Sequence, residues 1–206
     1  MILQSLIKFG SEKNIIELRD KGLIYMKNLP YFWKIENDEL RKDPCDGVDT
    51  IDNGINGVLL FQNTNRPVCI QKWNLKLLPN DSDKINIFCM FALRTEPINY
   101  PIDDRNVKFG NFALIITDPA EFIQRVHSHL CLNHVKHEAD LVKYLEFNHK
   151  GEVGLFKKKN SFSYQSEWRL VCYNGPGNER RIEIGSLSDI ADIVPSCEIN
   201  DRIIFK

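Results

Sequence analysis

The chain has 206 residues and a formal net charge of −1, with 43% apolar and 27% charged residues. This length suits one large domain, and this charge excludes a global attraction to nucleic acid or to an anionic membrane. The N-terminal "MILQSLIKFG" becomes polar too early for a signal peptide, and no apolar run reaches the length of a membrane span. Six scattered cysteines without a C-x-x-C pair indicate reduced thiols, so we predict one cytoplasmic domain over residues 1–206 with no membrane contact.

In the N-terminal third, "SEKNIIELRDKG" predicts a helix that begins after Ser11 as N-cap and stops at Gly22. "LIYMKNL" follows as a short strand. "PYFWKIENDELRKDP" begins with Pro30 and predicts a helix up to Asp43 and Pro44. The Gly-, Asn- and Asp-rich "DGVDTIDNGINGVLLF" predicts turns before a strand at residues 58–61.

Further along the chain, "KINIFCMFAL" and "NFALIIT" are continuous apolar runs of strand length, typical of strands covered on both faces. Asp118 and Pro119 then open a helix, "PAEFIQRVHSHLCLNH". Four more strands are predicted, at residues 141–147, 164–173, 181–184 and 202–205. Strands dominate and βαβ alternation is weak, so we predict an α+β fold with mostly antiparallel sheet and a few flanking helices.

Several common catalytic motifs are absent from the sequence. It contains no G-x-G-x-x-G after a strand, no phosphate-binding G-x-x-x-x-G-K-[ST], no H-E-x-x-H and no G-x-S-x-G. This argues against a Rossmann oxidoreductase, a P-loop NTPase, a zincin and an α/β-hydrolase.

A histidine cluster, "HSHLCLNHVKH", is the strongest compositional anomaly. On a helix, His127, Cys131 and His134 have the spacing i, i+4, i+7 and share a stripe that suits zinc if one more ligand is supplied. The alternative is a helix end at which histidines cap carbonyl groups and Cys131 packs in the core. We predict no metal and keep zinc as the weaker alternative.

A lysine run, Lys157, Lys158 and Lys159, precedes the stretch "SFSYQSEWRLVC". Such a run is usually a solvated loop. Beside a reactive site it would bind the phosphates of a dinucleotide or of a nucleic-acid backbone, and we predict that role for the three lysines.

The stretch "SFSYQSEWRLVC" reads as a strand in which Gln165, Glu167 and Arg169 share one face. Trp168 and the apolar "LVCY" indicate that the strand lies well inside the sheet, where polar groups need partners or a function. The common alternative is a solvent-facing strand with a Glu167–Arg169 pair.

A glutamine or glutamate two residues before a glutamate on a central strand resembles the last catalytic motif of ADP-ribosyltransferases. Three segments together resemble a large family of bacterial proteins placed beside those transferases: "GLIYMKNLPYFWKIENDELRKDPCDG", "KFGNFALIITDPAEFIQRV" and "FKKKNSFSYQSEWRL". Relatives of this kind include toxins of phage-defence toxin–antitoxin systems, of the DarT and CmdT types, which modify nucleic acid. The resemblance implies a split-sheet transferase fold, NAD as co-substrate and a possible antitoxin partner. The lysine run favours a nucleic-acid acceptor, RNA or DNA, over protein.

Carried to this chain, the resemblance makes Glu167 the catalytic glutamate and Gln165 the residue that orients the acceptor. The family's first-strand Arg or His is missing, and the chain has "IYMK" there. NAD-binding residues would accordingly be Tyr25, Lys27, Tyr31, Arg41 and Arg169. Cleavage of the nicotinamide–ribose bond passes through an oxocarbenium-like state, which a carboxylate bonded to the ribose 2′-hydroxyl stabilises.

Two other functions remain open at this point. The chain could be a non-catalytic binding or immunity protein on the same fold, as the missing first-strand Arg or His favours. Alternatively, it could be a zinc-dependent protein built on the cluster between His127 and His137.

Overall fold

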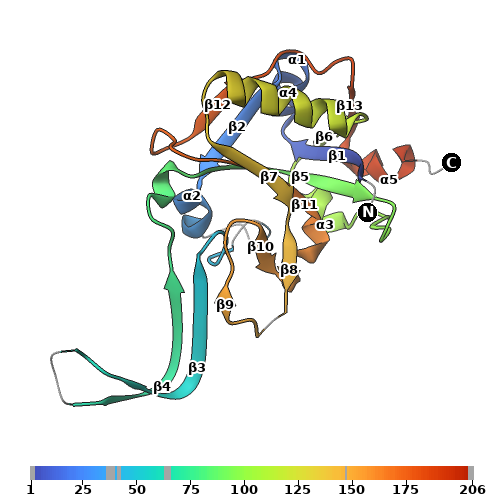
Figure 1. The fold of residues 1–206 in the computed structure, drawn as a ribbon. Coiled ribbons are helices and arrows are strands. Elements are labelled where there is room, and N and C mark those ends of the chain that lie inside the picture. The colour runs from blue at the N-terminus through green and yellow to red at the C-terminus, as the bar shows by residue number, and fades with distance from the viewer. Residues whose placement is uncertain (1–2, 36–39, 41–42, 63–65, 147, 204–206) are drawn as a thin grey trace.

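A computed structural model describes residues 3–35, 40, 43–62, 66–146 and 148–203 (Figure 1). Eight strands form the main sheet: β1 Leu3–Gly10, β2 Leu23–Asn28, β5 Asn86–Arg94, β6 Phe112–Ile116, β7 His137–Leu141, β11 Glu167–Cys172, β12 Arg180–Glu183 and β13 Ala191–Pro195. Five strands lie outside it: β3 Thr50–Leu59, β4 Val68–Leu77, β8 Lys143–Leu145, β9 Gly151–Glu152 and β10 Lys157–Lys159. The helices are α1 Glu12–Lys21, α2 Leu29–Lys34, α3 Asp104–Val107, α4 Pro119–Leu132 and α5 Ile199–Arg202, with 3₁₀ turns η1 Ser82–Lys84, η2 Asn160–Gln165 and η3 Ser196–Glu198.

Every strand pairing within the main sheet is antiparallel. The order is β12-β2-β5-β1-β6-β13, and β11 followed by β7 extends from the other edge of β5. The predicted α+β class with mostly antiparallel sheet and few helices is therefore confirmed. In the described part of the chain, every helix is too short or too polar to span a bilayer.

The main sheet splits along one edge of β5. Asn86 and Ile87 pair with β2, whereas residues 91–94 pair with β1. Between these two pairings the ammonium group of Lys8 donates a hydrogen bond to the carbonyl of Cys89, at 2.7 Å. The opposite edge of β5 pairs with β11 from Asn86 to Phe91, without a break beside the split, so the split opens on one side of the strand only.

Helices α1 and α4 cover one face of the sheet (Figure 1). Phe122, Val126 and Leu130 recur every four residues on α4 and are buried against that face, as expected of an amphipathic helix. Ser11 and Gly22 cap α1 as predicted, the latter in the left-handed conformation that glycine tolerates.

A long hairpin of β3 and β4 projects from the body (Figure 1). The predicted turns are therefore wrong over residues 50–57, which belong to β3, whereas the strand predicted at residues 58–61 is confirmed at residues 58 and 59. A Cβ atom on Gly54 or Gly57 would meet the ring of Trp73 on the partner strand at 2.3–2.4 Å. Glycine is needed there because the indole lies directly against the opposite backbone.

The helix predicted from Pro30 to Pro44 is also shorter than expected. Helix α2 ends at Lys34, and Ile35 is extended. The indole N–H of Trp33 donates to the carbonyl of Asp46 at 2.7 Å, which ties the backbone at Asp46 to helix α2.

Candidate active site

Four charged side chains are buried together beneath the split: Asp46, Lys158, Glu167 and Arg169. The Arg169 side chain is fully buried and binds both Asp46 carboxylate oxygens, at 2.7 and 3.1 Å. It also donates to Glu167 Oε2 at 2.8 Å and to the carbonyl of Leu155 at 2.7 Å. The paired charges sum to zero, as burial of ions requires.

Lys158 completes this cluster from strand β10. Its ammonium group lies 2.8 Å from Gln165 Oε1, 2.6 Å from Glu167 Oε1 and 3.3 Å from Asp46 Oδ2. These three contacts match the three N–H donors of an ammonium group. The phosphate-binding role stays a prediction for the three lysines: the charge of Lys158 is buried and paired with carboxylates, while Lys157 and Lys159 are partly exposed.

The backbone before β11 differs from the predicted strand. Residues 160–165 form the 3₁₀ turn η2, and Ser166 has a φ of 41°, so the strand begins at Glu167. Ser166 is held by a 3.1 Å hydrogen bond to the carbonyl of Ala92 and a 2.7 Å bond from Asn99 Nδ2. Gln165 and Glu167 still converge, through their shared contact with Lys158 rather than through strand alternation.

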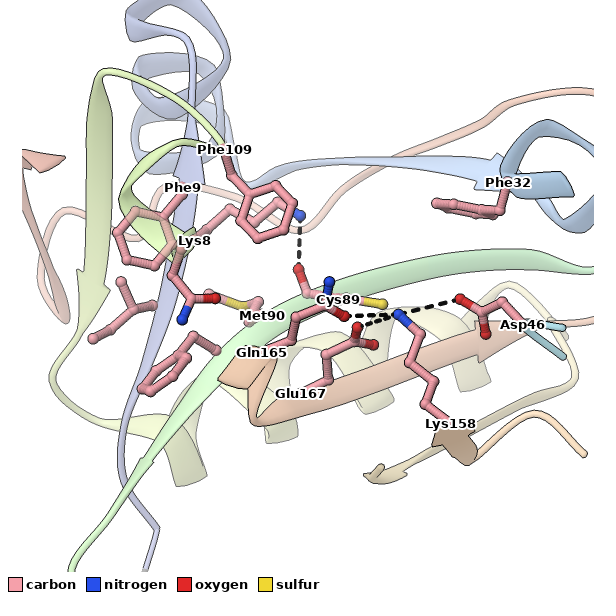
Figure 2. Close-up of a pocket in the computed structure, with 13 residues that line it drawn as sticks. Lys8, Phe9, Phe32, Asp46, Cys89, Met90, Phe109, Lys158, Gln165 and Glu167 are labelled. Atoms are coloured by element: carbon pink, nitrogen blue, oxygen red, sulfur yellow. Dashed lines mark hydrogen bonds and ion pairs between the residues drawn. The ribbon is translucent and has the colours of Figure 1, made fainter. Parts of the chain in front are cut away.

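A cleft of about 160 Å³ lies over the split and opens to solvent (Figure 2). In the view of Figure 2, Phe9 and Phe109 lie toward one end and Phe32 toward the other, above the row of polar groups. The cleft thus combines aromatic walls with a polar floor. Its lining residues are Ile7, Lys8, Phe9, Phe32, Asp46, Cys89, Met90, Phe91, Asn106, Phe109, Lys158, Gln165 and Glu167.

Glu167 and Lys158 on the floor of the cleft hold each other in their charged forms. Burial alone would raise the pKa of Glu167, but the charges of Lys158 and Arg169 outweigh burial and hold that pKa well below its usual range. Burial alone would likewise lower the pKa of Lys158, whereas Asp46 and Glu167 hold it well above its usual range. Glu167 is therefore suited to stabilise positive charge or to accept a hydrogen bond from a hydroxyl group, and not to donate a proton.

Cys89 is the thiol on the cleft floor, and it is a poor nucleophile. Burial, together with the negative charge of Glu167, raises its pKa to about 12. Since the thiolate is the reactive form, Cys89 contributes shape rather than chemistry.

Comparison of the chain with protein-family models, curated proteins and solved structures returns no match. The site must therefore be interpreted from its own geometry.

The predicted NAD-binding residues do not assemble around this cleft. Lys27 lies 4.9 Å from the ring centroids of both Tyr25 and Tyr31, and these three are not among the described residues that line the cleft. Arg169 is fully buried, binds protein groups and is not among the described residues that line the cleft, so the structure gives no support to its predicted contact with a cofactor. Arg41 lies outside the described residues.

Sequence reasoning missed Asp46, the counter-ion of Arg169. It sits in "DPCDG", where an Asp before a Gly indicates a turn and nothing more. The aromatic walls contributed by Phe9 and Phe109 were also missed, because each belongs to an apolar segment that reads as core.

The histidine cluster forms only in part as predicted. His127 and Cys131 share a face of α4, but His134 lies beyond the helix end with a φ of 54°. His137, at the start of β7, takes its place beside the other two. Cys131 is exposed, so its predicted core packing is wrong.

We expect acid to destabilise the protein through Glu167. Its pKa is lower in the folded state than its ordinary 4.5, so the unfolded chain binds the extra proton. The stabilisation is complete above about pH 4.5 and is lost as the pH falls toward the folded pKa, at up to about 1.4 kcal/mol per pH unit. Urea unfolding at pH 7, 5, 4 and 3 measures this slope. Equal slopes in wild type and in Lys158→Met/Glu167→Gln would contradict the assignment to Glu167.

Proposed function

We propose that the protein cleaves NAD at the nicotinamide–ribose bond and transfers ADP-ribose, as a mono-ADP-ribosyltransferase. The observation that carries the proposal is that an ionised glutamate and its neighbour Gln165 line one aromatic cleft over a split in an antiparallel sheet. This arrangement supports the ADP-ribosyltransferase-like fold implied by the sequence resemblance.

The chemistry requires a fixed negative charge beside a planar leaving group. Each oxygen of Glu167 accepts one strong hydrogen bond from a cation, and a carboxylate oxygen can accept two. One lone pair on each oxygen is therefore left for a ligand hydroxyl, such as the 2′-hydroxyl of a ribose. That contact strengthens as positive charge develops on the sugar. Because it is stronger in the transition state than in the ground state, it lowers the activation barrier.

The cleft volume supports recognition of one ring rather than of a whole dinucleotide. A cavity of about 150 Å³ accommodates a benzene-sized ring, and this one has about 160 Å³. We therefore expect nicotinamide to occupy the space among Phe9, Phe32 and Phe109, with the adenylate extending beyond the cleft. The partly exposed Lys157 and Lys159 leave a nucleic-acid acceptor as our favoured choice over protein.

The deciding experiment uses the full chain with NAD labelled in its adenylate group and a mixture of cellular RNA, DNA and protein. We expect release of nicotinamide and label that disappears on treatment with a nuclease. If the label disappears only on treatment with protease, the transferase activity stands and the acceptor is protein. No release of nicotinamide above the protein-free control would overturn the proposal.

A second function, NAD binding without chemistry, is favoured by one observation. Lys158 and Arg169 both pair with the Glu167 carboxylate, which weakens its attraction for a developing cation. A non-catalytic immunity or binding protein would show a rise in Tm on addition of NAD but no nicotinamide release.

A further inference from the structure

Three ligand-type side chains meet on the surface of the α4 side of the sheet. His127 and Cys131 are one turn apart on α4, and His137 opens the neighbouring strand β7. One nitrogen from each ring and the sulfur all lie within 4.8 Å of one another. The nearest ring nitrogens, His127 Nδ1 and His137 Nε2, are 2.9 Å apart, and Cys131 Sγ is 3.5 Å from His127 Nε2.

Hydrogen bonding sets the tautomer of His137. Its Nδ1 lies 2.8 Å from the carbonyl oxygen of Val135, which can only accept, so Nδ1 carries the proton. Nε2 then carries the lone pair, and it points toward His127. A backbone carbonyl bound to the far nitrogen is the usual partner that orients a metal-bound histidine.

Packing does not explain why these groups converge. His127 and Cys131 are exposed, and His137 is only half-buried. The last turn of α4 is capped by other groups, because Asn133 Nδ2 donates to the carbonyl of His129 at 2.8 Å. Two imidazoles and a thiol at one point are therefore not required by the core or by the helix end.

We propose that His127, Cys131 and His137 form a binding site for a borderline divalent transition-metal ion, with zinc as the first choice. Tetrahedral zinc has Zn–N bonds of about 2.0–2.1 Å and Zn–S bonds of about 2.3 Å, so its ligand atoms lie about 3.3–3.7 Å apart. Side-chain rotations that open the 2.9 Å contact and close the longer ones would reach that geometry. The site supplies two nitrogens and one thiolate and leaves the fourth position to water, since it faces solvent.

The site is independent of the proposed NAD chemistry. The residue paired with His137 on β11 is Cys172, which packs in the core beneath α4. Glu167 and Arg169 alternate with Trp168 and point to the opposite face of the sheet. Loss of the metal and loss of NAD cleavage can thus be measured separately.

The test is a Co²⁺ titration of the full chain, purified without a metal-affinity tag. We expect one equivalent to bind with a thiolate-to-cobalt absorption band and to be displaced by Zn²⁺. His137→Ala should weaken Co²⁺ binding by more than about 100-fold, because even the outer partners of metal ligands are worth 10–100-fold. His134→Asn is the matched control: asparagine tolerates the left-handed backbone, and we expect unchanged affinity.

A second readout follows the thiol itself. Zn²⁺ should slow alkylation of Cys131 and leave that of the exposed Cys69 and Cys197 unchanged, as resolved by peptide mass spectrometry. Cobalt binding without a thiolate band, equal affinities of wild type and His137→Ala, or equal protection of all three thiols would each overturn the proposal.

Discussion

We expect the Arg169→Met variant to have a free energy of unfolding about 3–5 kcal/mol below that of the wild-type chain. Methionine fills a similar volume but removes the cation that holds Asp46 and Glu167. Those two carboxylates would then share Lys158 alone, and a buried negative charge would remain without a partner. Urea unfolding should show a lower midpoint with an unchanged slope against urea.

The matched control for this variant is Arg105→Met. Arg105 also binds an aspartate through two nitrogens, Asp103 at 2.9 and 2.7 Å, but both side chains are exposed. Exposed pairs contribute at most about 1 kcal/mol. Similar losses of stability in the two variants would mean that burial of the cluster is not what makes Arg169 important.

We expect the second large effect in the catalytic activity of the Glu167→Gln variant. Removing the fixed charge beside the reacting sugar should lower the rate of nicotinamide release by about 10²–10³-fold, as for other preorganised electrostatic groups. The variant also leaves the buried cluster with one excess positive charge, so a loss of stability is expected as well. Activity and the free energy of unfolding must therefore be measured on the same preparations.

A double variant separates these two effects. Lys158→Met/Glu167→Gln removes one cation and one anion and leaves the Asp46–Arg169 pair balanced. We expect it to regain most of the stability lost in Glu167→Gln and none of the activity. Wild-type rates of NAD cleavage in a folded double variant would show that Glu167 is a structural ion and not a catalytic residue. The exposed pair of Glu198 with Arg202 supplies a control, since Glu198→Gln should change neither quantity.

The parts of the fold that the sequence predicted are those with local causes. Helix α1 follows from its caps, Ser11 and Gly22, and β5 follows from an uninterrupted apolar run. Most of β3 was mistaken for turns because of its glycines, which in the structure make room for the ring of Trp73 on the partner strand. That contact joins two strands, so the sequence of β3 alone does not reveal it.

The same distinction applies to the site. Glu167 and Gln165 were predicted from their spacing, and they do line one cleft. Their partners were not predicted: Asp46 is 123 residues from Arg169 along the chain, and Lys158 looked like part of a solvated run. Charge pairing over such a distance depends on the tertiary fold, which spacing alone does not reveal.

The root of the projecting hairpin lies close to the cleft. Asp46 precedes β3 by four residues, and the backbone of Val48 and Asp49 is tied to Gly154, Val153 and Leu77. The next residue, Leu155, offers its carbonyl to Arg169. A molecule that binds the far end of the β3–β4 hairpin would therefore act, through a short hydrogen-bonded stretch, on the segment that carries Asp46. Binding at a distance from the cleft would in this way reach the carboxylate on its floor.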